Sequence, residues 1–126
     1  MQLKTRHYVI IALLLVTAFL HFGAAFDGRI FPEHRPDLLF TLNGLGYLGL
    51  LMAYFLPLGF LQQRRRLIWW TLFAYIIVTI LAWVIIWVGI NVLIGGKPFF
   101  DLDSLYGVPA KTAEVILLFL LWRDKP

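Results

Sequence analysis

Residues 67–93 read LIWWTLFAYIIVTILAWVIIWVGINVL and contain no charged side chain. A helix that crosses the ~30 Å hydrocarbon core of a bilayer needs about 20 mostly apolar residues. At about 1.5 Å of rise per residue, this stretch is long enough to cross with a tilt or with one end outside the bilayer. The stretch therefore predicts a membrane-spanning helix, and the rest of the chain can be divided on the same basis.

Three further apolar segments have the length of a membrane span, at about residues 7–25, 37–61 and 106–122. The 126-residue chain is 61% hydrophobic and 14% charged, with a mean hydropathy of +0.83. A soluble domain of this size cannot bury so much apolar surface. Because the connections are short, neighbouring helices should pack antiparallel. We therefore predict an all-α fold, an integral membrane four-helix up-down bundle that forms a single domain over residues 1–126.

The connections between the spans are polar or contain helix breakers. Residues 26–36 mix charges of both signs with two prolines, and Gln62–Arg66 form a tight basic turn. Pro57 falls in the last turns of the second span and should kink that helix or end its regular hydrogen bonding. The last span is short, and Pro126 ends the sequence.

The distribution of Lys and Arg predicts the orientation. Seven of the eleven lie on the same side of the predicted bundle as the N-terminus: Lys4, Arg6, Arg64, Arg65, Arg66, Arg123 and Lys125. Arg29, Arg35, Lys97 and Lys111 lie at or near the opposite side. Because cytoplasmic segments are enriched in Lys and Arg, we expect both termini in the cytoplasm. The expected location is the plasma (inner) membrane of a prokaryotic cell.

The first span also has features of a secretory signal peptide. Lys4 and Arg6 precede an apolar core, and the small residues Gly23, Ala24 and Ala25 follow it, as in a cleavable signal. Cleavage would leave three spans with a translocated start. We expect the segment to be retained as a span.

Polar side chains inside the spans gather in the outer half. His21, Asn43, Lys111 and Glu114 come from three spans at similar depth, and Tyr47 lies one turn deeper. Such residues are costly in hydrocarbon, and they tend to face a bundle interior or a cavity. We interpret these five residues as an outward-facing site for a small polar or amphipathic ligand. His21 and Glu114 would be its proton-sensitive groups and Lys111 its anion-facing group.

A purely structural interpretation of the same residues remains open. Lys111 and Glu114, three apart on a helix, can neutralise each other, and Lys111 can extend to the headgroups. His21 can act as an anchor at the boundary, and Asn43 can join two helices. Trp83 and Trp87 lie deep in the third span and fit packing, lipid contact or the wall of a ligand site.

Two other functions also remain open. The chain can be a non-catalytic subunit or assembly factor of a larger membrane complex, such as an energy-transducing one. It can also be an enzyme acting on lipid or quinone, with His21 and Glu114 as acid and base, although a non-enzymatic role is favoured. Gly46, Gly49 and Ala53 in the second span allow close helix packing, either within the monomer or across a homodimer.

Several classes of function lack their residues. The sequence contains no cysteine, which excludes disulfides and cysteine-ligated metal or iron–sulfur sites. It has no phosphate-binding glycine loop, metalloprotease helix motif or nucleophile elbow. His7, His21 and His34 do not have the spacing of a metal motif, so no metal or other cofactor is expected. The basic residues flank the spans, and we therefore expect a lipid bilayer as partner and no nucleic acid.

Overall fold

The structure is a computed structural model that describes residues 2–29, 37–99 and 102–126, with side chains in the last range from Leu105 onward. In this part of the chain all regular structure is helical. The elements are α1 (Thr5–Phe26), α2 (Leu38–Phe55), α3 (Gly59–Gln63), α4 (Arg65–Trp83), the π-helix η1 (Val84–Ile94) and α5 (Leu102–Arg123).

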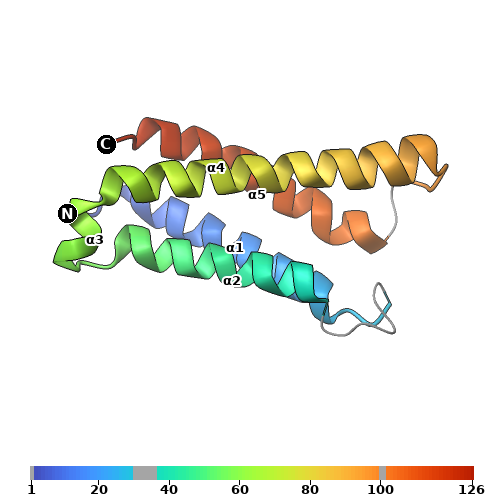
Figure 1. Ribbon diagram of the computed structural model, residues 1–126, viewed down its shortest axis with the longest axis horizontal. Helices are drawn as coiled ribbons and strands as arrows, with labels where there is room; N and C mark the ends of the chain where they lie inside the picture. The colour runs from blue at the N-terminus through green and yellow to red at the C-terminus, as the bar shows by residue number, and fades with distance from the viewer. Residues whose placement is uncertain (1, 30–36, 100–101) are drawn as a thin grey trace.

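Four of the described helical segments are long and apolar enough to cross a membrane: Thr5–Phe26, Leu38–Phe55, Arg65–Ile94 and Leu105–Arg123. The prediction of an all-α protein with four such helices is confirmed. The third segment joins α4 and η1 into one long rod, drawn in light green to orange in Figure 1. Large apolar side chains such as Leu39 and Leu93 point outward from these helices, at 77% and 76% exposure. An outer surface of this kind is suited to lipid.

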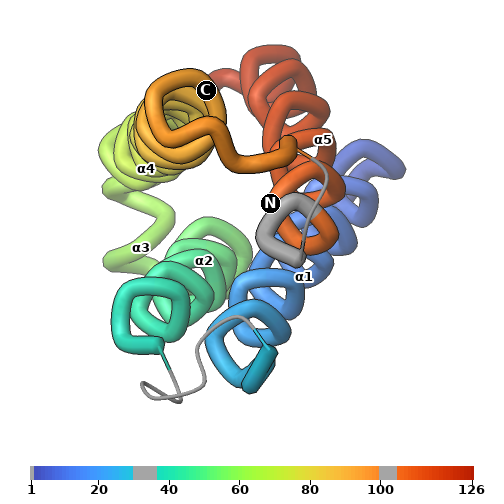
Figure 2. Tube along the Cα trace, turned by 90° about the vertical axis from the view of Figure 1, so that its right-hand side faces the viewer, coloured from blue at the N-terminus to red at the C-terminus, as the bar shows by residue number. Residues whose placement is uncertain are grey.

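The four long helices lie at the corners of a square when viewed along their axes (Figure 2). Helix α1 packs against α2 and α5, and α4 packs against the same two helices. The pairs α1 with α4 and α2 with α5 are therefore diagonal. Both chain ends and α3 lie at one end of the bundle, at the left of Figure 1, which we call the termini end. We call the opposite end, with residues 27–29 and 95–99, the loop end.

The helix boundaries differ from the expected spans at three places. The expected segment 37–61 is too long for the second helix, because α2 ends at Phe55, just before Pro57, and the chain resumes as the short helix α3. Helix α4 already begins at Arg65, so the expected basic turn is shorter. Helix α5 begins at Leu102, before the expected 106, and accommodates Pro109 in its second turn. Proline there removes one backbone donor without ending the helix.

An apolar core closes the middle of the bundle. Its members are fully buried and come from α1, α4 and α5: Ile10, Leu14, Leu72, Ile76, Leu117 and Leu121. Tyr47 and Tyr54 of α2 complete the core on its two sides. The core therefore separates polar groups at the loop end from polar groups at the termini end.

The small residues of α2 face two different environments. A Cβ atom added at Gly46 would clash with the Tyr75 hydroxyl of α4, whereas one added at Gly49 would meet no atom within 4 Å. Gly46 thus allows close packing inside this chain, and Gly49 faces outward. A homodimer through Gly46, Gly49 and Ala53 stays a prediction.

Candidate functional site

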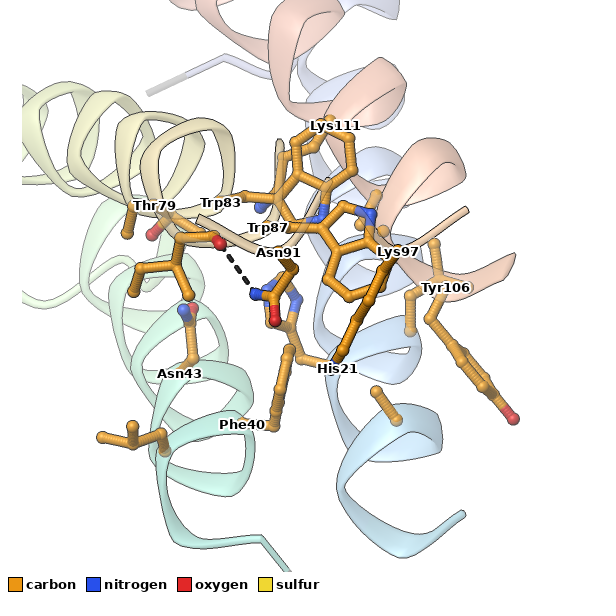
Figure 3. A pocket seen from close by; sticks show the side chains of 17 residues that line it. His21, Phe40, Asn43, Thr79, Trp83, Trp87, Asn91, Lys97, Tyr106 and Lys111 are labelled. Carbon is orange, nitrogen blue, oxygen red and sulfur yellow. Dashed lines mark hydrogen bonds between the residues drawn. The ribbon is translucent and has the colours of Figure 1, made fainter. Parts of the chain in front are cut away.

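A cavity of about 470 Å³ opens at the loop end, between all four long helices (Figure 3). Most of its wall is apolar, with aromatic rings from Phe40, Trp83, Trp87 and Tyr106. Its polar lining residues are His21, Asn43, Thr79, Asn91, Lys97 and Lys111. Ligand pockets typically have volumes of about 300–1,000 Å³ and combine apolar walls with a few placed polar groups. The cavity has both properties.

His21 lies in the cavity wall with a defined tautomer. Its Nδ1 is 2.7 Å from the backbone oxygen of Thr17. A carbonyl oxygen only accepts hydrogen bonds, so Nδ1 must carry the hydrogen, and the Nε2 of a neutral imidazole is left as an acceptor. The Oε1 of Glu114 is 4.0 Å from Nε2, beyond hydrogen-bond distance. Nε2 is therefore available to a hydrogen-bond donor.

Glu114 lies beneath the cavity and is fully buried. Its Oε2 is 2.7 Å from the Lys111 Nζ, and its Oε1 accepts a hydrogen bond of 2.7 Å from the Tyr47 hydroxyl. The carboxylate thus has a cation on one oxygen and a neutral donor on the other. Lys111 and Glu114 neutralise each other, as the structural interpretation of the sequence expects for this pair.

Asn43 has a structural contact as well as a place in the cavity wall. The Tyr75 hydroxyl lies 2.8 Å from the Asn43 backbone oxygen and 3.1 Å from its Oδ1. Asn43 therefore joins α2 to α4. Of the five residues predicted from the sequence, His21, Asn43 and Lys111 line the cavity, whereas Tyr47 and Glu114 form the buried layer below it.

Trp87 and Asn91 extend the site along η1, beyond the residues chosen from the sequence. The buried Nε1–H of Trp87 has no hydrogen-bond partner among the described residues, and Thr17 Oγ1 is the other such buried side-chain atom there. Asn91 donates from Nδ2 to the Ile86 oxygen at 2.7 Å. Trp83, Trp87 and Asn91 are four residues apart in the sequence, which places them on one face of a helix. This spacing could have indicated that the site extends along the third span.

The cavity wall includes an unusual helix geometry. η1 is a π-helix, and its end is marked by a bond of 2.9 Å from the Gly95 nitrogen to the Ile90 oxygen, five residues back. The side chain of Asn91 bridges the same interval to Ile86. π-Helical turns are rare and occur frequently at functional sites. Here the wider turn carries Trp87 and Asn91 on the cavity side of the rod.

The rim of the cavity is held by a contact between α5 and the residue after α1. The Tyr106 hydroxyl donates to Asp27 Oδ2 at 2.7 Å, and Arg29 NH2 donates to the same oxygen at 2.8 Å. The hydrogen bonds from Arg29 and Tyr106 hold the pKa of Asp27 well below its usual range. The carboxylate of Asp27, held by two hydrogen-bond donors, therefore lies near the cavity opening.

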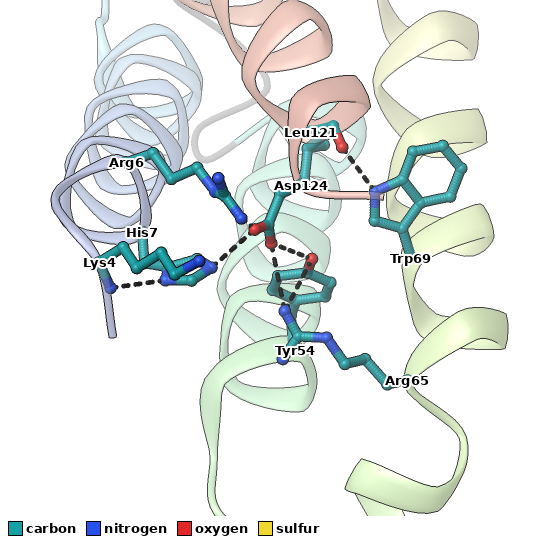
Figure 4. Close-up of polar contacts among 8 residues, drawn as sticks. All are labelled: Lys4, Arg6, His7, Tyr54, Arg65, Trp69, Leu121 and Asp124. Atoms are coloured by element: carbon teal, nitrogen blue, oxygen red, sulfur yellow. Dashed lines mark hydrogen bonds and ion pairs between the residues drawn. The ribbon is translucent and has the colours of Figure 1, made fainter. Parts of the chain in front are cut away.

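A second polar cluster, which the sequence analysis did not anticipate, lies at the termini end and centres on Asp124 (Figure 4). Asp124 Oδ1 accepts from Arg6 Nε at 2.8 Å and from His7 Nε2 at 2.7 Å. Its Oδ2 accepts from Tyr54 at 2.6 Å and from Arg65 at 3.2 Å. The cluster forms because Asp124, the residue after α5, lies among side chains of α1, α2 and α4.

Asp124 is only 6% exposed, yet its surroundings favour the charged carboxylate. Burial acts to raise the pKa of Asp124, but hydrogen bonds from Tyr54, Arg6 and His7 outweigh it and lower the pKa below its ordinary value. The cluster links all four long helices at one point. We assign it a structural role, because both carboxylate oxygens of Asp124 accept hydrogen bonds from within the chain.

The described residues contain no group of three or more His, Cys, Asp or Glu side chains arranged to hold a metal ion. No protein-family model, curated protein or solved structure matches the chain significantly.

Proposed function

We propose that this chain is a small membrane protein that binds an amphipathic small molecule in the cavity at the loop end. The observation that carries the proposal is the coexistence of aromatic walls with polar atoms that have no hydrogen-bond partner among the described residues. Trp87 Nε1 has no partner among the described residues, and the tautomer of His21 leaves its Nε2 as an acceptor. A ligand with an apolar body and a polar head would satisfy both atoms and cover the aromatic rings.

Binding fits the structure better than conduction. The apolar core below Glu114 is built from fully buried residues, among them Leu14, Ile76 and Leu117. A polar solute that crossed this core would lose its hydration without gaining partners, which is costly. The apolar core therefore closes the cavity toward the termini end.

In this proposal the chain is an integral membrane four-helix up-down bundle in the plasma membrane of a prokaryote, with both termini in the cytoplasm. The termini end carries the Arg64–Arg66 run together with Arg123 and Lys125, and Lys and Arg are enriched on the cytoplasmic side. The ammonium group of Lys125 lies over the Trp122 and Trp70 rings, at 4.8 and 5.2 Å, at the level where aromatic belts form. The cavity then opens to the outside.

Mass spectrometry of small molecules that stay bound through mild-detergent purification tests the binding function. Ala110 is buried in the cavity wall, so Ala110→Phe should fill the cavity. Val78→Phe adds a ring on a surface that is 64% exposed and serves as the matched control. We expect wild type and Val78→Phe to retain an amphipathic molecule that Ala110→Phe loses. Equal retention by all three, or no bound molecule in any, contradicts the proposal.

The orientation can be tested separately, because the sequence contains no cysteine. A single cysteine at Asn91 lies in the cavity wall, and one at Gln63 lies exposed at the termini end. In intact spheroplasts, a membrane-impermeant thiosulfonate should modify Asn91→Cys and should modify Gln63→Cys only after permeabilisation. The reverse pattern would place the cavity on the cytoplasmic side.

A further inference from the structure

Two side chains in the cavity wall carry one hydrogen-bond acceptor and one donor without a partner among the described residues, and these define the head of a ligand. His21 Nδ1 is held by the Thr17 oxygen at 2.7 Å, so the acceptor is Nε2. The donor is the Trp87 indole N–H, in a side chain that is 6% exposed and lines the cavity. An unmade hydrogen bond at a buried group is costly. A matching ligand therefore brings a hydrogen to His21 and an oxygen to Trp87.

The charges around the cavity favour a neutral head over an anionic one. Lys111 is the cation nearest the cavity floor, and it is already paired with Glu114 at 2.7 Å. Lys97 lies exposed at the mouth, where water screens its charge. A carboxylate or phosphate inside would also place its charge against the lone pair of His21 Nε2. A hydroxyl group avoids this conflict because it donates and accepts at once.

The walls favour an aromatic body for the ligand. Phe40, Trp83 and Trp87 provide rings from α2, α4 and η1, as Figure 3 shows. The Phe40 ring also lies beside the His21 imidazole, with centroids 6.0 Å apart. Aromatic pairs gain energy beyond the apolar area that they bury. A flat ring with a hydroxyl substituent fits this lining better than a flexible alkyl head.

From these three observations, and resting on the proposed binding function, we propose that the ligand is a phenolic lipid of the hydroquinone type. Its hydroxyl group donates to His21 Nε2, and an oxygen of the head accepts from Trp87 Nε1. Its ring lies among the aromatic side chains, and its apolar tail lies along the apolar part of the cavity wall. The proposal concerns binding of the reduced molecule.

The test uses full-length protein in lipid nanodiscs with three related probes: decylubiquinol, its dimethyl ether and decylubiquinone, titrated calorimetrically under reducing conditions where needed. The ether and the quinone keep acceptor oxygens but lack the hydroxyl hydrogen. We expect the quinol to bind on the order of tenfold more tightly than either. In His21→Phe, which removes the acceptor, the quinol and the ether should bind within about twofold of each other.

Trp87→Phe provides an independent readout. Because the indole N–H has no partner among the described residues, Trp87→Phe breaks no hydrogen bond of the free protein and costs only the packing of the larger ring. Trp87→Phe should weaken the binding of the quinol and of the ether by a similar factor, on the order of fivefold, since both ligands accept a hydrogen bond from Trp87. Trp70→Phe, far from the cavity at the termini end, is the matched control and should leave both affinities unchanged. Unaltered binding of both the quinol and the ether to Trp87→Phe would overturn the role of Trp87.

Other ligand classes are separated by two further probes, lauric acid and dodecanol. Tighter binding of lauric acid than of the quinol overturns the neutral head and indicates an anionic amphiphile. Equal binding of dodecanol overturns the aromatic body. Equal binding of quinol, ether and quinone overturns the hydroxyl contact to His21, while the binding function stands. Failure of every probe overturns the phenolic ligand, and the Ala110→Phe comparison then decides separately whether the cavity binds anything.

Discussion

Tyr47 and Glu114 form a hydrogen bond of 2.7 Å that joins α2 to α5, the two helices on one diagonal of the bundle. Both side chains are fully buried. The bond thus crosses the interior at the level of the cavity floor and holds together helices that do not pack against each other directly.

Removal of this bond should destabilise the protein measurably. Among the described residues, Tyr47 is the only donor within hydrogen-bond distance of Glu114 Oε1, so Tyr47→Phe leaves that oxygen unpaired. We expect a loss of about 1–3 kcal/mol in the free energy of unfolding, measured by denaturation in mixed detergent micelles. Tyr8→Phe removes a hydroxyl from a side chain that is 59% exposed and is the control. Equal stability of the two variants would contradict a buried diagonal bond.

The ion pair below the cavity predicts strong non-additivity. Lys111→Met leaves the Glu114 carboxylate buried without its cation, which should cost roughly 3–5 kcal/mol. Glu114→Gln keeps a similar shape and removes the charge. The double variant should therefore be more stable than Lys111→Met alone. A double-mutant cycle of unfolding free energies measures the coupling, and additive effects would show that the 2.7 Å contact does not persist in the folded protein.

The helices and part of the site could be predicted because both depend on local sequence properties. The run at 67–93 predicts a spanning helix by length and hydropathy alone, and the structure contains one at Arg65–Ile94. His21, Asn43 and Lys111 could be placed near one another from the rise per residue along three helices. Their common cavity follows from that shared depth.

The remaining features depend on tertiary contacts that spacing does not reveal. Trp87 can be recognised as a site residue only once the structure shows that its indole N–H has no hydrogen-bond partner among the described residues. Asp124 belongs to a terminal Arg-Asp-Lys-Pro sequence that has the composition of a solvated tail, and its burial requires Arg6, His7 and Tyr54 to converge from two other helices. Likewise, no periodicity in the sequence distinguishes the π-helical segment η1 from an α-helix.

Two glycines in α2 provide a matched pair of substitutions. Gly46→Ala would place a methyl group against the Tyr75 hydroxyl, which is held at 2.8 Å from the Asn43 oxygen. The resulting overpacking should cost about 1–3 kcal/mol, partly offset by the higher helix propensity of alanine. Gly49→Ala meets open space and should be neutral or stabilising by up to about 1 kcal/mol. Thermal unfolding in detergent distinguishes them, and equal shifts would contradict the close approach at Gly46.

The Asp124 cluster predicts that its contribution to stability disappears in acid. The pKa of Asp124 is lowered in the folded chain, so the folded state favours the carboxylate more than the unfolded state does. This contribution is present above the unfolded pKa, about 3.9, and is lost as the pH falls through the lower folded value. At pH 5, Asp124→Asn should therefore be less stable than wild type by roughly 3 kcal/mol.

The same comparison should show a difference that shrinks below about pH 3.9, where the unfolded wild-type chain takes up a proton at Asp124, and that is smallest once the pH is below the lower folded pKa. Unfolding free energies of both proteins between pH 5 and pH 2.5 measure the change, and other carboxyl groups cancel in the difference. Arg66→Gln alters the charge at the same end on an exposed side chain and should show no such convergence. A wild-type advantage that stays constant down to pH 2.5 would mean that the hydrogen bonds of Asp124 stabilise the folded chain without requiring its charge.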